Sequence, residues 1–397
     1  MLTPVEEALA RILADAQPVS GAEFLPLAAC RGRVLASDVY ADIDVPPADN
    51  SSMDGYALRF EDYAAGQRRF RLSQRVTAGA VGAPLEPGTA VRIFTGAELP
   101  PGADTVVMQE DTQAEEGVVS FGEGLRERDN VRPRGQDIAA GSRVAEAGIR
   151  LSSAYLGLLA SVGFAGVQVL PRLRVAILST GNELVEPGQP LAPGQIYNSN
   201  RYMLAGMLED LGMTVVDMGI VPDDPAGTRR LLAEAAEAAD VVLSTGGVSV
   251  GEEDHVKGAV EALGELHLWK LAIKPGKPLA YGRVAGKPFF GLPGNPSSVF
   301  VTFSVIARPY LLRMQGLRQD LHLPEVQAIA DFDWPKPGKR QEYLRARLET
   351  HGDGAVVRLY PNQSSGVLAS VAWGTCLVVV PVGGVVRKGG GVRVLLT

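Results

Sequence analysis

The sequence predicts an α/β fold accompanied by β-rich domains, and three observations lead to this prediction. The chain has 397 residues, which is enough for roughly two to four domains with a sizeable core. Between residues 173 and 315, short apolar runs alternate with helix-like segments, which is typical of a doubly wound parallel sheet. On either side the chain runs in short β-like segments separated by Gly and Pro, which predicts a β domain before this region and a small β-barrel or sandwich after it.

Composition and charge exclude several classes of protein. The formal net charge is −7 and there is no basic run, which argues against a nucleic-acid-binding protein. The two cysteines, Cys30 and Cys376, are far apart, so neither a disulfide framework nor a zinc site is predicted. Residues 1–16 carry acids and lack the apolar core of a signal peptide, and no apolar run approaches the ~18 residues of a membrane span. We therefore expect a soluble, cytoplasmic protein that binds neither nucleic acid nor membrane.

The N-terminal part predicts a β segment inserted into a partly helical domain. Residues 5–16 place apolar side chains on one helical face, which predicts a packing helix. Residues 60–146 are β-like and rich in turns, whereas residues 151–159 predict a second helix. Because helix-like segments flank the β segment, we expect it to be an insertion. The predicted domains are 1–45 with 141–172 (N-terminal, elongated), 46–140 (inserted, β-rich), 173–315 (doubly wound) and 321–397 (C-terminal β-barrel).

Polar residues of the inserted segment suit either a binding site or ordinary turns. After Pro46 and Pro47, residues 49–52 are small and hydrogen-bonding, so a shaped binding loop and a plain turn are equally good interpretations. Thr95 follows a predicted strand and precedes a glycine. Asp137 lies beside two arginines, where a solvated salt-bridge surface is the usual explanation.

Polar loops follow five predicted strands of the doubly wound region. They are STGNE (179–183), VPDD (221–224), STGGVSVGEED (244–254), IKPGKP (273–278) and GLPGNP (291–296). In open α/β sheets, ligands bind at the carboxyl ends of the strands. Because the five loops would meet at one edge of the sheet, we predict a functional site there rather than mere packing.

The loop at 244–254 is the centre of this expected site. An apolar strand precedes it, and Gly246 and Gly247 allow a sharp turn and a close approach to a ligand. A strand that leads through such a loop into a helix favours anions through free N–H groups and the helix dipole. An ordinary βα loop with acidic helix caps would look similar, and the acids of the loop show that binding a bare anion cannot be its whole role.

The charged residues of the five loops predict the chemistry of the site. Glu183, Asp223 and Asp254 would face one crevice, where neighbouring carboxylates repel one another unless a cation such as Mg²⁺ binds between them. Lysines near the rim suit an oxyanion; they are Lys270, Lys274 and Lys277. The sequence has no Walker A motif, GxGxxG motif or nucleophile elbow. Together these features predict a phosphate-bearing ligand, a divalent metal and an oxyanion reactant.

The motifs together resemble the molybdopterin molybdenumtransferase family, which is related to the E domain of gephyrin. The five loops carry this resemblance together with NSSMDGYA (50–57), the Thr95 segment and RGQD (134–137), and it covers essentially the whole chain. It implies an elongated homodimer of four-domain subunits, whose active site lies between the doubly wound domain of one subunit and the inserted domain of the other. It also implies the reaction: adenylylated molybdopterin and molybdate give molybdenum cofactor and AMP, with Mg²⁺.

The resemblance assigns roles to individual residues. The expected catalytic residues are Asp54, Thr95, Asp137, Glu183, Asp223, Asp254, Lys270 and Lys274, and the expected metal ligands are Glu183, Asp223 and Asp254. A second set of residues is expected to bind the cofactor or molybdate, with Ser364 as an alternative to Ser365. These residues are Ser244, Gly246, Gly247, Ser249, Gly251, Lys277, Pro293, Gly294, Asn295, Pro296, Arg345 and Ser365. The family often has Ala where this chain has Ser52, a change that should not affect the chemistry.

Three other functions remain open at this point. A molybdopterin adenylyltransferase would resemble residues 173–315 alone, and a competence-damage-type nucleotide hydrolase would share the TGGVSVG loop but not the MDGYA segment. A cofactor-binding or anchoring protein without catalysis is the third. A molybdopterin adenylyltransferase and molybdoenzyme chaperones are candidate partners, and the sequence does not distinguish molybdate from tungstate as the substrate.

Overall fold

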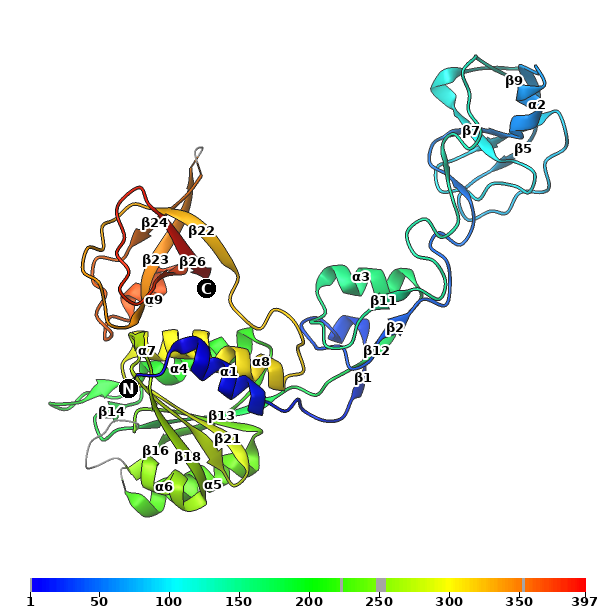
Figure 1. Cartoon of the computed structure of the whole chain (residues 1–397). Coiled ribbons are helices and arrows are strands. Elements are labelled where there is room, and N and C mark those ends of the chain that lie inside the picture. The colour runs from blue at the N-terminus through cyan, green and yellow to red at the C-terminus, as the bar shows by residue number, and fades with distance from the viewer. Residues whose placement is uncertain (1, 222–223, 248–254, 352–353) are drawn as a thin grey trace.

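The computed structural model describes residues 2–221, 224–247, 255–351 and 354–397. The molecule is elongated, as Figure 1 shows: a sheet domain and a β-barrel lie together at one end, and a small connecting domain leads to a β-rich inserted domain at the other. The predicted fold class, with a doubly wound domain, an inserted β domain and a C-terminal barrel, is confirmed.

The sheet domain contains six strands, of which five share one direction. Their order is β16 (Thr214–Val221), β13 (Arg174–Thr180), β17 (Val241–Thr245), β21 (Lys287–Leu292), β20 (Pro278–Val284) and β18 (Gly264–Lys270). The sequence analysis expected only parallel strands, but β20 runs antiparallel to both neighbours. The reason is a two-residue turn between β20 and β21, in which Ala285 and Gly286 both have positive φ (46° and 78°), as a tight hairpin requires. Because β18 is antiparallel to β20, its carboxyl end still reaches the predicted edge.

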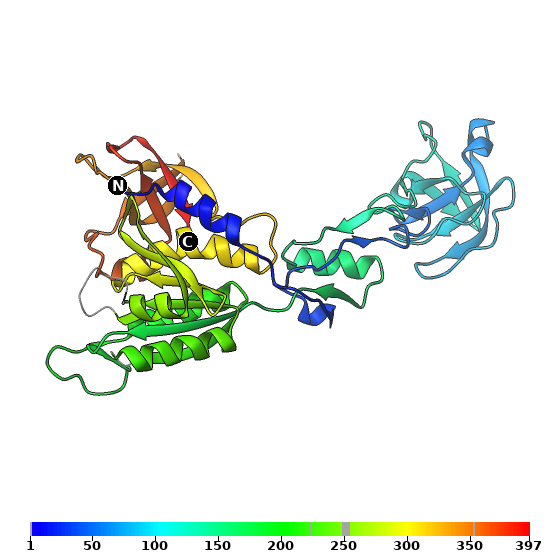
Figure 2. The ribbon, with the colours of Figure 1, turned by 60° about the horizontal axis from the view of Figure 1, so that its bottom comes forward.

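Helices cover both faces of this sheet because the side chains of its strands alternate. Ala176 and Leu178 of β13 pack under α5 (Pro225–Ala238) and α6 (His255–Leu263). Val175 and Ile177 point to the opposite face and join the core formed with α4 (Ser199–Asp210), α7 (Pro296–Thr302), the π-helical turn η3 (Phe303–Ala307) and α8 (Arg308–Met314). Helix α1 (Val5–Asp15) buries its apolar face in that same core, beside the sheet domain and the barrel (Figure 2).

The connecting and inserted domains are built from small antiparallel units. In the connecting domain, β1 (Glu23–Pro26) pairs with β12 (Gly166–Val169) and β2 (Val39–Tyr40) with β11 (Arg143–Ala145), beside η1 (Leu27–Ala29) and α3 (Ser153–Ser161).

The inserted domain has a six-stranded sheet with α2 (Phe60–Ala64) and η2 (Gln109–Asp111). Its strand order is β7 (Thr105–Met108), β4 (Gly55–Leu58), β6 (Thr89–Ile93), β5 (Arg69–Val76), β9 (Val118–Phe121) and β8 (Thr112–Glu115). Two short strands, β3 (Asn50–Ser51) and β10 (Val131–Arg132), pair at the base of this domain.

The C-terminal part closes into a five-stranded barrel. The ring is β23 (Gln341–His351), β24 (Gly354–Leu359), β22 (Glu325–Ala330), β26 (Gly391–Leu396) and β25 (Cys376–Val380), and β25 pairs back onto β23. Helix α9 (Ala369–Trp373) lies against β23. A short strand of the sheet domain, β19 (Ile273–Lys274), pairs with the start of β23 and thereby joins the IKPGKP loop to the barrel.

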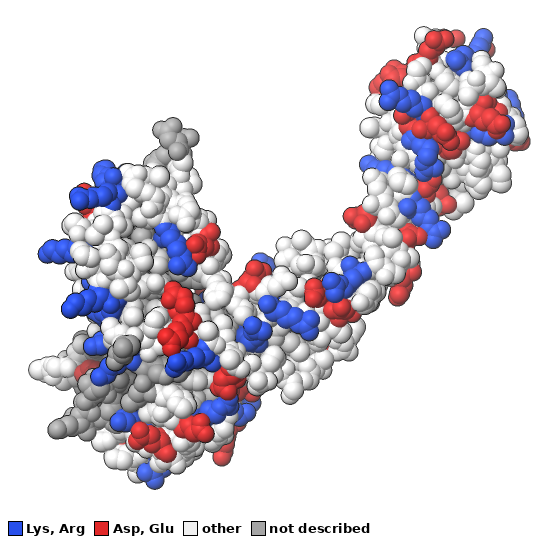
Figure 3. Space-filling model, in the orientation of Figure 1, with Lys and Arg blue, Asp and Glu red and all other residues white. Residues whose placement is uncertain are grey.

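The surface carries charges of both signs. On the face drawn in Figure 3, Lys and Arg side chains are interspersed with Asp and Glu side chains along the whole molecule, without one continuous basic surface. Among the described residues, no helix has the length and apolar character needed to cross a membrane.

Candidate functional site

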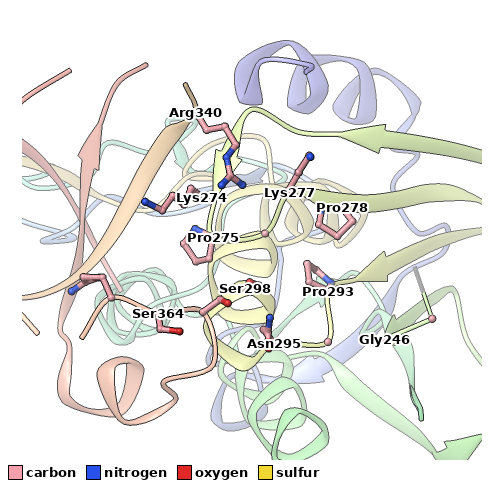
Figure 4. A pocket seen from close by; sticks show the side chains of 15 residues that line it. Gly246, Lys274, Pro275, Lys277, Pro278, Pro293, Asn295, Ser298, Arg340 and Ser364 are labelled. Atoms are coloured by element: carbon pink, nitrogen blue, oxygen red, sulfur yellow. The ribbon is translucent and has the colours of Figure 1, made fainter. Parts of the chain in front are cut away.

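A cavity of about 530 Å³ opens where the carboxyl edge of the sheet meets the barrel. We call it the edge cavity, and Figure 4 shows side chains from both domains around it. Its lining residues are Gly246, Gly247, Lys274, Pro275, Gly276, Lys277, Pro278, Pro293, Gly294, Asn295, Ser298, Arg340, Gln363, Ser364 and Ser365. Three of the five predicted loops therefore meet here, together with two segments of the barrel.

Gly246 and Gly247 form one wall of the edge cavity because β17 turns sharply at its end. Both have positive φ (80° and 64°), where an L side chain would be strained. A Cβ atom on Gly246 would also lie 2.7 Å from the carbonyl oxygen of Thr180, and one on Gly247 would lie 2.5 Å from Cγ2 of Val256. Glycine is thus required at both positions, because the backbone has a positive φ and because there is no room for a side chain.

The GLPGNP loop forms a second wall and connects the two domains. The carbonyl oxygen of Asn295 accepts hydrogen bonds from the N–H groups of Ser298 and Val299 (3.0 Å each), which begins α7. The Asn200 side chain donates to the carbonyl oxygen of Gly294 (2.7 Å). From the barrel, the carbonyl oxygen of Ser365 accepts the N–H of Ser297 (3.0 Å), so Ser365 is held at the cavity by backbone pairing.

Three cations give the edge cavity a positive lining. They are Lys274, Lys277 and Arg340, and no Asp or Glu lines the cavity in the described part of the chain. Lys274 Nζ lies 3.3 Å from both carboxylate oxygens of Glu342, whereas Arg340 donates to a backbone carbonyl, that of Ile273 (3.1 Å). Lys277 is exposed and forms no ion pair with any described residue. Such a lining suits an anion with several acceptor oxygens.

Arg345 does not line the cavity but supports the segment that does. Its side chain is only 1% exposed and donates to the carbonyl oxygens of Ser364 (2.9 Å) and Tyr343 (3.4 Å) and to Ser370 Oγ (3.0 Å). Burial lowers the pKa of Arg345 to about 10, so it remains charged at neutral pH. The structure therefore places this predicted molybdate ligand one layer behind Ser364.

Other predicted residues of the sheet domain lie near the edge cavity without lining it. Lys270 is exposed at the end of β18, and Pro296 opens α7. Ser244 is fully buried in β17, and its Oγ has no hydrogen-bond partner among the described residues.

Of the three predicted metal ligands, Glu183 lies within the described part of the chain. Glu183 is exposed in the loop after β13, and its carboxylate lies over Gly181, where an added Cβ would be 2.4 Å from Oε2. Asp223, Asp254, Ser249 and Gly251 lie outside the described residues. Within the described ranges, no group of three or more His, Cys, Asp or Glu side chains could hold a metal ion. Mg²⁺ binding therefore stays a prediction. Of its three predicted ligands, Glu183 lies within the described residues.

The remaining predicted catalytic residues lie in or beside the inserted domain, which Figure 1 shows at the far end of the molecule from the sheet domain and the barrel. Asp54 Oδ1 accepts hydrogen bonds from the N–H (2.8 Å) and the hydroxyl (2.7 Å) of Thr95. The Thr95 N–H, followed by its hydroxyl, lowers the pKa of Asp54. Asp137 is exposed, and its N–H donates to the carbonyl oxygen of Val45 (2.9 Å). A single chain therefore brings Asp54 and Thr95 together, but it does not bring them to Lys274 and Lys277 of the edge cavity.

Sequence reasoning missed several residues of the site. Pro275, Gly276, Pro278 and Ser298 are neighbours of predicted residues, so the loop motifs themselves were the signal. Arg340 and Gln363 belong to the barrel, and nothing in the sequence placed them beside the sheet, whereas Ser364 was expected only as an alternative to Ser365. Glu342 gave no signal, because its role depends on pairing between β19 and β23.

Comparisons with known proteins agree with this organisation. Three family models match in order: "MoeA N-terminal region (domain I and II)" at residues 3–163, "Probable molybdopterin binding domain" at 176–313 and "MoeA C-terminal region (domain IV)" at 327–397.

Individual relatives match over nearly their whole length. A molybdopterin molybdenumtransferase of Haemophilus influenzae is 38% identical over 385 residues, covering 96% of this chain and 94% of the relative. Molybdopterin molybdenumtransferase 2 of Mycobacterium tuberculosis is 38% identical over 365 residues, covering 89% and 90%. Two crystal structures of a molybdopterin biosynthesis MoeA protein from Pyrococcus horikoshii match with TM-scores of 0.82 and 0.87, at 34% and 29% identity, over at least 99% of each chain. The chain belongs to the MoeA family of molybdopterin molybdenumtransferases.

Proposed function

We propose that this protein is a molybdopterin molybdenumtransferase that inserts molybdenum from molybdate into adenylylated molybdopterin, releasing AMP and forming molybdenum cofactor. The observation that carries the proposal is the edge cavity, whose described lining has three cations, serines and glycine loops but no carboxylate. A tetrahedral dianion and a phosphate-bearing pterin both match such a lining.

The lining residues would bind different parts of the substrates according to their chemistry. Lys274, Lys277 and Arg340 supply charge-assisted hydrogen bonds to oxyanion oxygens, and Ser364 and Ser365 stand on the barrel side of the same space. The backbone turns at Gly246 and Gly294 leave room for a close approach of a phosphate. Positioning and electrostatics in such a site supply most of a rate enhancement.

Glu183, with Asp223 and Asp254, would hold the Mg²⁺ that the proposal includes. When bound, Mg²⁺ would neutralise charge on the phosphoanhydride that links molybdopterin to AMP. Glu183 itself is exposed at the carboxyl edge of the sheet, where a phosphate oxygen could share its cation.

A homodimer would complete the site. Asp54, Thr95 and Asp137 stand in or beside the inserted domain, away from the edge cavity of their own chain, so we propose that they serve the cavity of a second copy. The protein would work in the cytoplasm, receive its substrate from a molybdopterin adenylyltransferase and pass its product to molybdoenzyme chaperones.

The deciding experiment measures AMP release from purified protein given adenylylated molybdopterin, Mg²⁺ and molybdate, with molybdate or Mg²⁺ omitted as controls. We expect AMP release that depends on molybdate and is accompanied by active cofactor. Binding without AMP release would indicate a carrier or anchoring protein instead. Formation of adenylylated molybdopterin from ATP would indicate an adenylyltransferase.

A further inference from the structure

Lys274 is the one described cation of the edge cavity that already has a carboxylate partner. The short strand β19 pairs with β23 in a register that places Lys274 directly opposite Glu342. Lys274 Nζ lies 3.3 Å from both Oε1 and Oε2 of Glu342. The backbone pairing of the two domains therefore fixes Glu342 behind Lys274, which lines the cavity.

The two partners differ in freedom. Glu342 is 4% exposed, its Oε2 accepts the indole N–H of Trp334 (3.1 Å), and an added Cβ on Gly338 would lie 2.5 Å from Oε1. The carboxylate is therefore held in place by its surroundings. The side chain of Lys274 is 47% exposed and reaches the edge cavity, so the ammonium is the partner that can turn.

The other two cations are not neutralised in this way. Arg340 donates to a backbone carbonyl, and Lys277 forms no ion pair with described residues. Within the described part of the chain, an incoming oxyanion therefore meets two cations without a carboxylate partner and a third whose charge Glu342 already offsets. Glu342 also repels the oxyanion directly, because like charges a few ångströms apart interact unfavourably where water is partly excluded.

We propose that Glu342 is an internal competitor for Lys274 and lowers the affinity of the edge cavity for oxyanions. The proposal rests on the proposed function, since it assumes that an oxyanion binds here. A permanently bound oxyanion could not be transferred, so a built-in carboxylate that shares the lysine would favour delivery over storage. Glu342 is in this sense an affinity-setting residue and not a catalytic one.

The test is calorimetric titration of the full-length protein with molybdate, comparing wild type, Glu342→Gln and Lys274→Ala. Glutamine keeps the size and an acceptor for Trp334 but removes the charge. We expect Glu342→Gln to lower Kd about two- to fivefold, the range typical of a partly exposed ion pair, and Lys274→Ala to raise it. In the double variant the gain from Glu342→Gln should shrink, because there is no ammonium left to release.

Glu325→Gln is the matched control, since it makes the same change in the same barrel at a pair with Arg393 (2.8 Å) that does not line the edge cavity. It should leave Kd unchanged. If Glu342→Gln is poorly folded by circular dichroism, Trp334→Phe offers an opposite test. Phenylalanine keeps an aromatic ring near the Lys274 ammonium, which lies 5.8 Å from the centroid of the Trp334 ring, but it removes the indole N–H from Oε2, so Glu342 holds Lys274 more strongly and Kd should rise.

The outcomes separate the two proposals. If wild type neither binds molybdate nor releases AMP with it, the proposed function fails. If wild type binds molybdate but Glu342→Gln binds it equally or more weakly, Glu342 merely supports Lys274 and the competitor proposal is overturned.

Discussion

A single oxygen of Asp54 accepts two hydrogen bonds from Thr95, one from its N–H (2.8 Å) and one from its hydroxyl (2.7 Å). The two residues come from different strands of the inserted domain, Asp54 just before β4 and Thr95 just after β6, and the pairing of those strands brings them together. The bonds stabilise the ionised carboxylate, and its second oxygen accepts no hydrogen bond from the described residues.

We expect Asp54→Ala to abolish turnover without loss of the fold. The side chain is exposed, so its removal leaves no buried cavity, while the charge that Thr95 positions is lost. AMP release and circular dichroism of the same preparation check this. Full activity in the folded variant would remove Asp54 from the catalytic residues.

The acid limb of the pH profile should move when Thr95 is changed to Val. Hydrogen bonds lower the folded-state pKa of Asp54, so its carboxylate stays ionised, and its contribution to stability is lost only as pH falls through that lowered value. Thr95→Val keeps the N–H, the larger cause, and removes the hydroxyl. The pKa should rise partway toward its ordinary value and the loss of activity should begin at higher pH. An unchanged acid limb would show that Asp54 ionisation does not limit the reaction.

Lys277→Ala should weaken oxyanion binding and leave stability unchanged. Lys277 is exposed, lines the edge cavity and forms no ion pair with described residues, so its ammonium has little structural role. Loss of a charge-assisted hydrogen bond typically costs about 1.5–3 kcal/mol, which corresponds to roughly a 10- to 150-fold rise in KM for molybdate. Lys287→Ala, at the opposite edge of the sheet, is the control. An equal KM in both variants would contradict the placement of the oxyanion.

Arg345→Met should destabilise the barrel and disturb the edge cavity together. The buried guanidinium holds the carbonyl oxygen of Ser364 and the hydroxyl of Ser370, and each acceptor left unsatisfied costs about 1–3 kcal/mol. Thermal unfolding and molybdate titration measure the two effects. Arg358→Met, which breaks ion pairs with Asp331 and Glu349 at an exposed site, should cost about 1 kcal/mol or less. Normal stability of Arg345→Met with lost binding would instead favour direct contact with molybdate.

Gly276→Ala, in the wall of the edge cavity, should lower the melting temperature more than Gly286→Ala does. Both glycines have positive φ (103° and 78°), so the backbone strain of the substitution is similar in kind. A Cβ on Gly276 would lie 2.4 Å from Thr302 Oγ1, whereas one on Gly286 would meet no atom within 4 Å. The difference between the two melting temperatures therefore isolates the steric contribution. Equal melting temperatures would mean that Thr302 can move aside.

Asp54→Ala and Lys277→Ala should complement each other if the site forms between two copies. Each variant alone lacks one half of every site, but a mixed dimer would have one site with both residues intact. Mixing the two variants, with exchange of subunits, should restore part of the AMP release at a molybdate concentration well below the raised KM of Lys277→Ala. Absence of recovery, in mixtures shown to contain mixed dimers, would contradict the homodimeric site.

Local chemistry was sufficient to predict that polar loops gather at the carboxyl edge of the sheet, where the edge cavity lies. The loops after β13, β17, β18 and β21 are polar and contain glycine, and strands that share one direction bring their carboxyl ends to the same edge of the sheet. Gly246 illustrates this, because its positive φ and its contact with Thr180 are requirements of the turn itself. The family, the fold class and most residues of the cavity wall followed from such motifs.

Only the tertiary structure decided those features that depend on pairing between segments far apart in the chain. The hairpin at Ala285 and Gly286 reversed β20 within a sheet that hydrophobic runs alone made look parallel. The register between β19 and β23 set Glu342 against Lys274, and the closed barrel turned Arg345 inward behind Ser364. Sequence patterns record which side chains are polar and which are buried along one element. They do not record which elements meet, because strand register and domain packing arise from contacts between residues far apart in the chain.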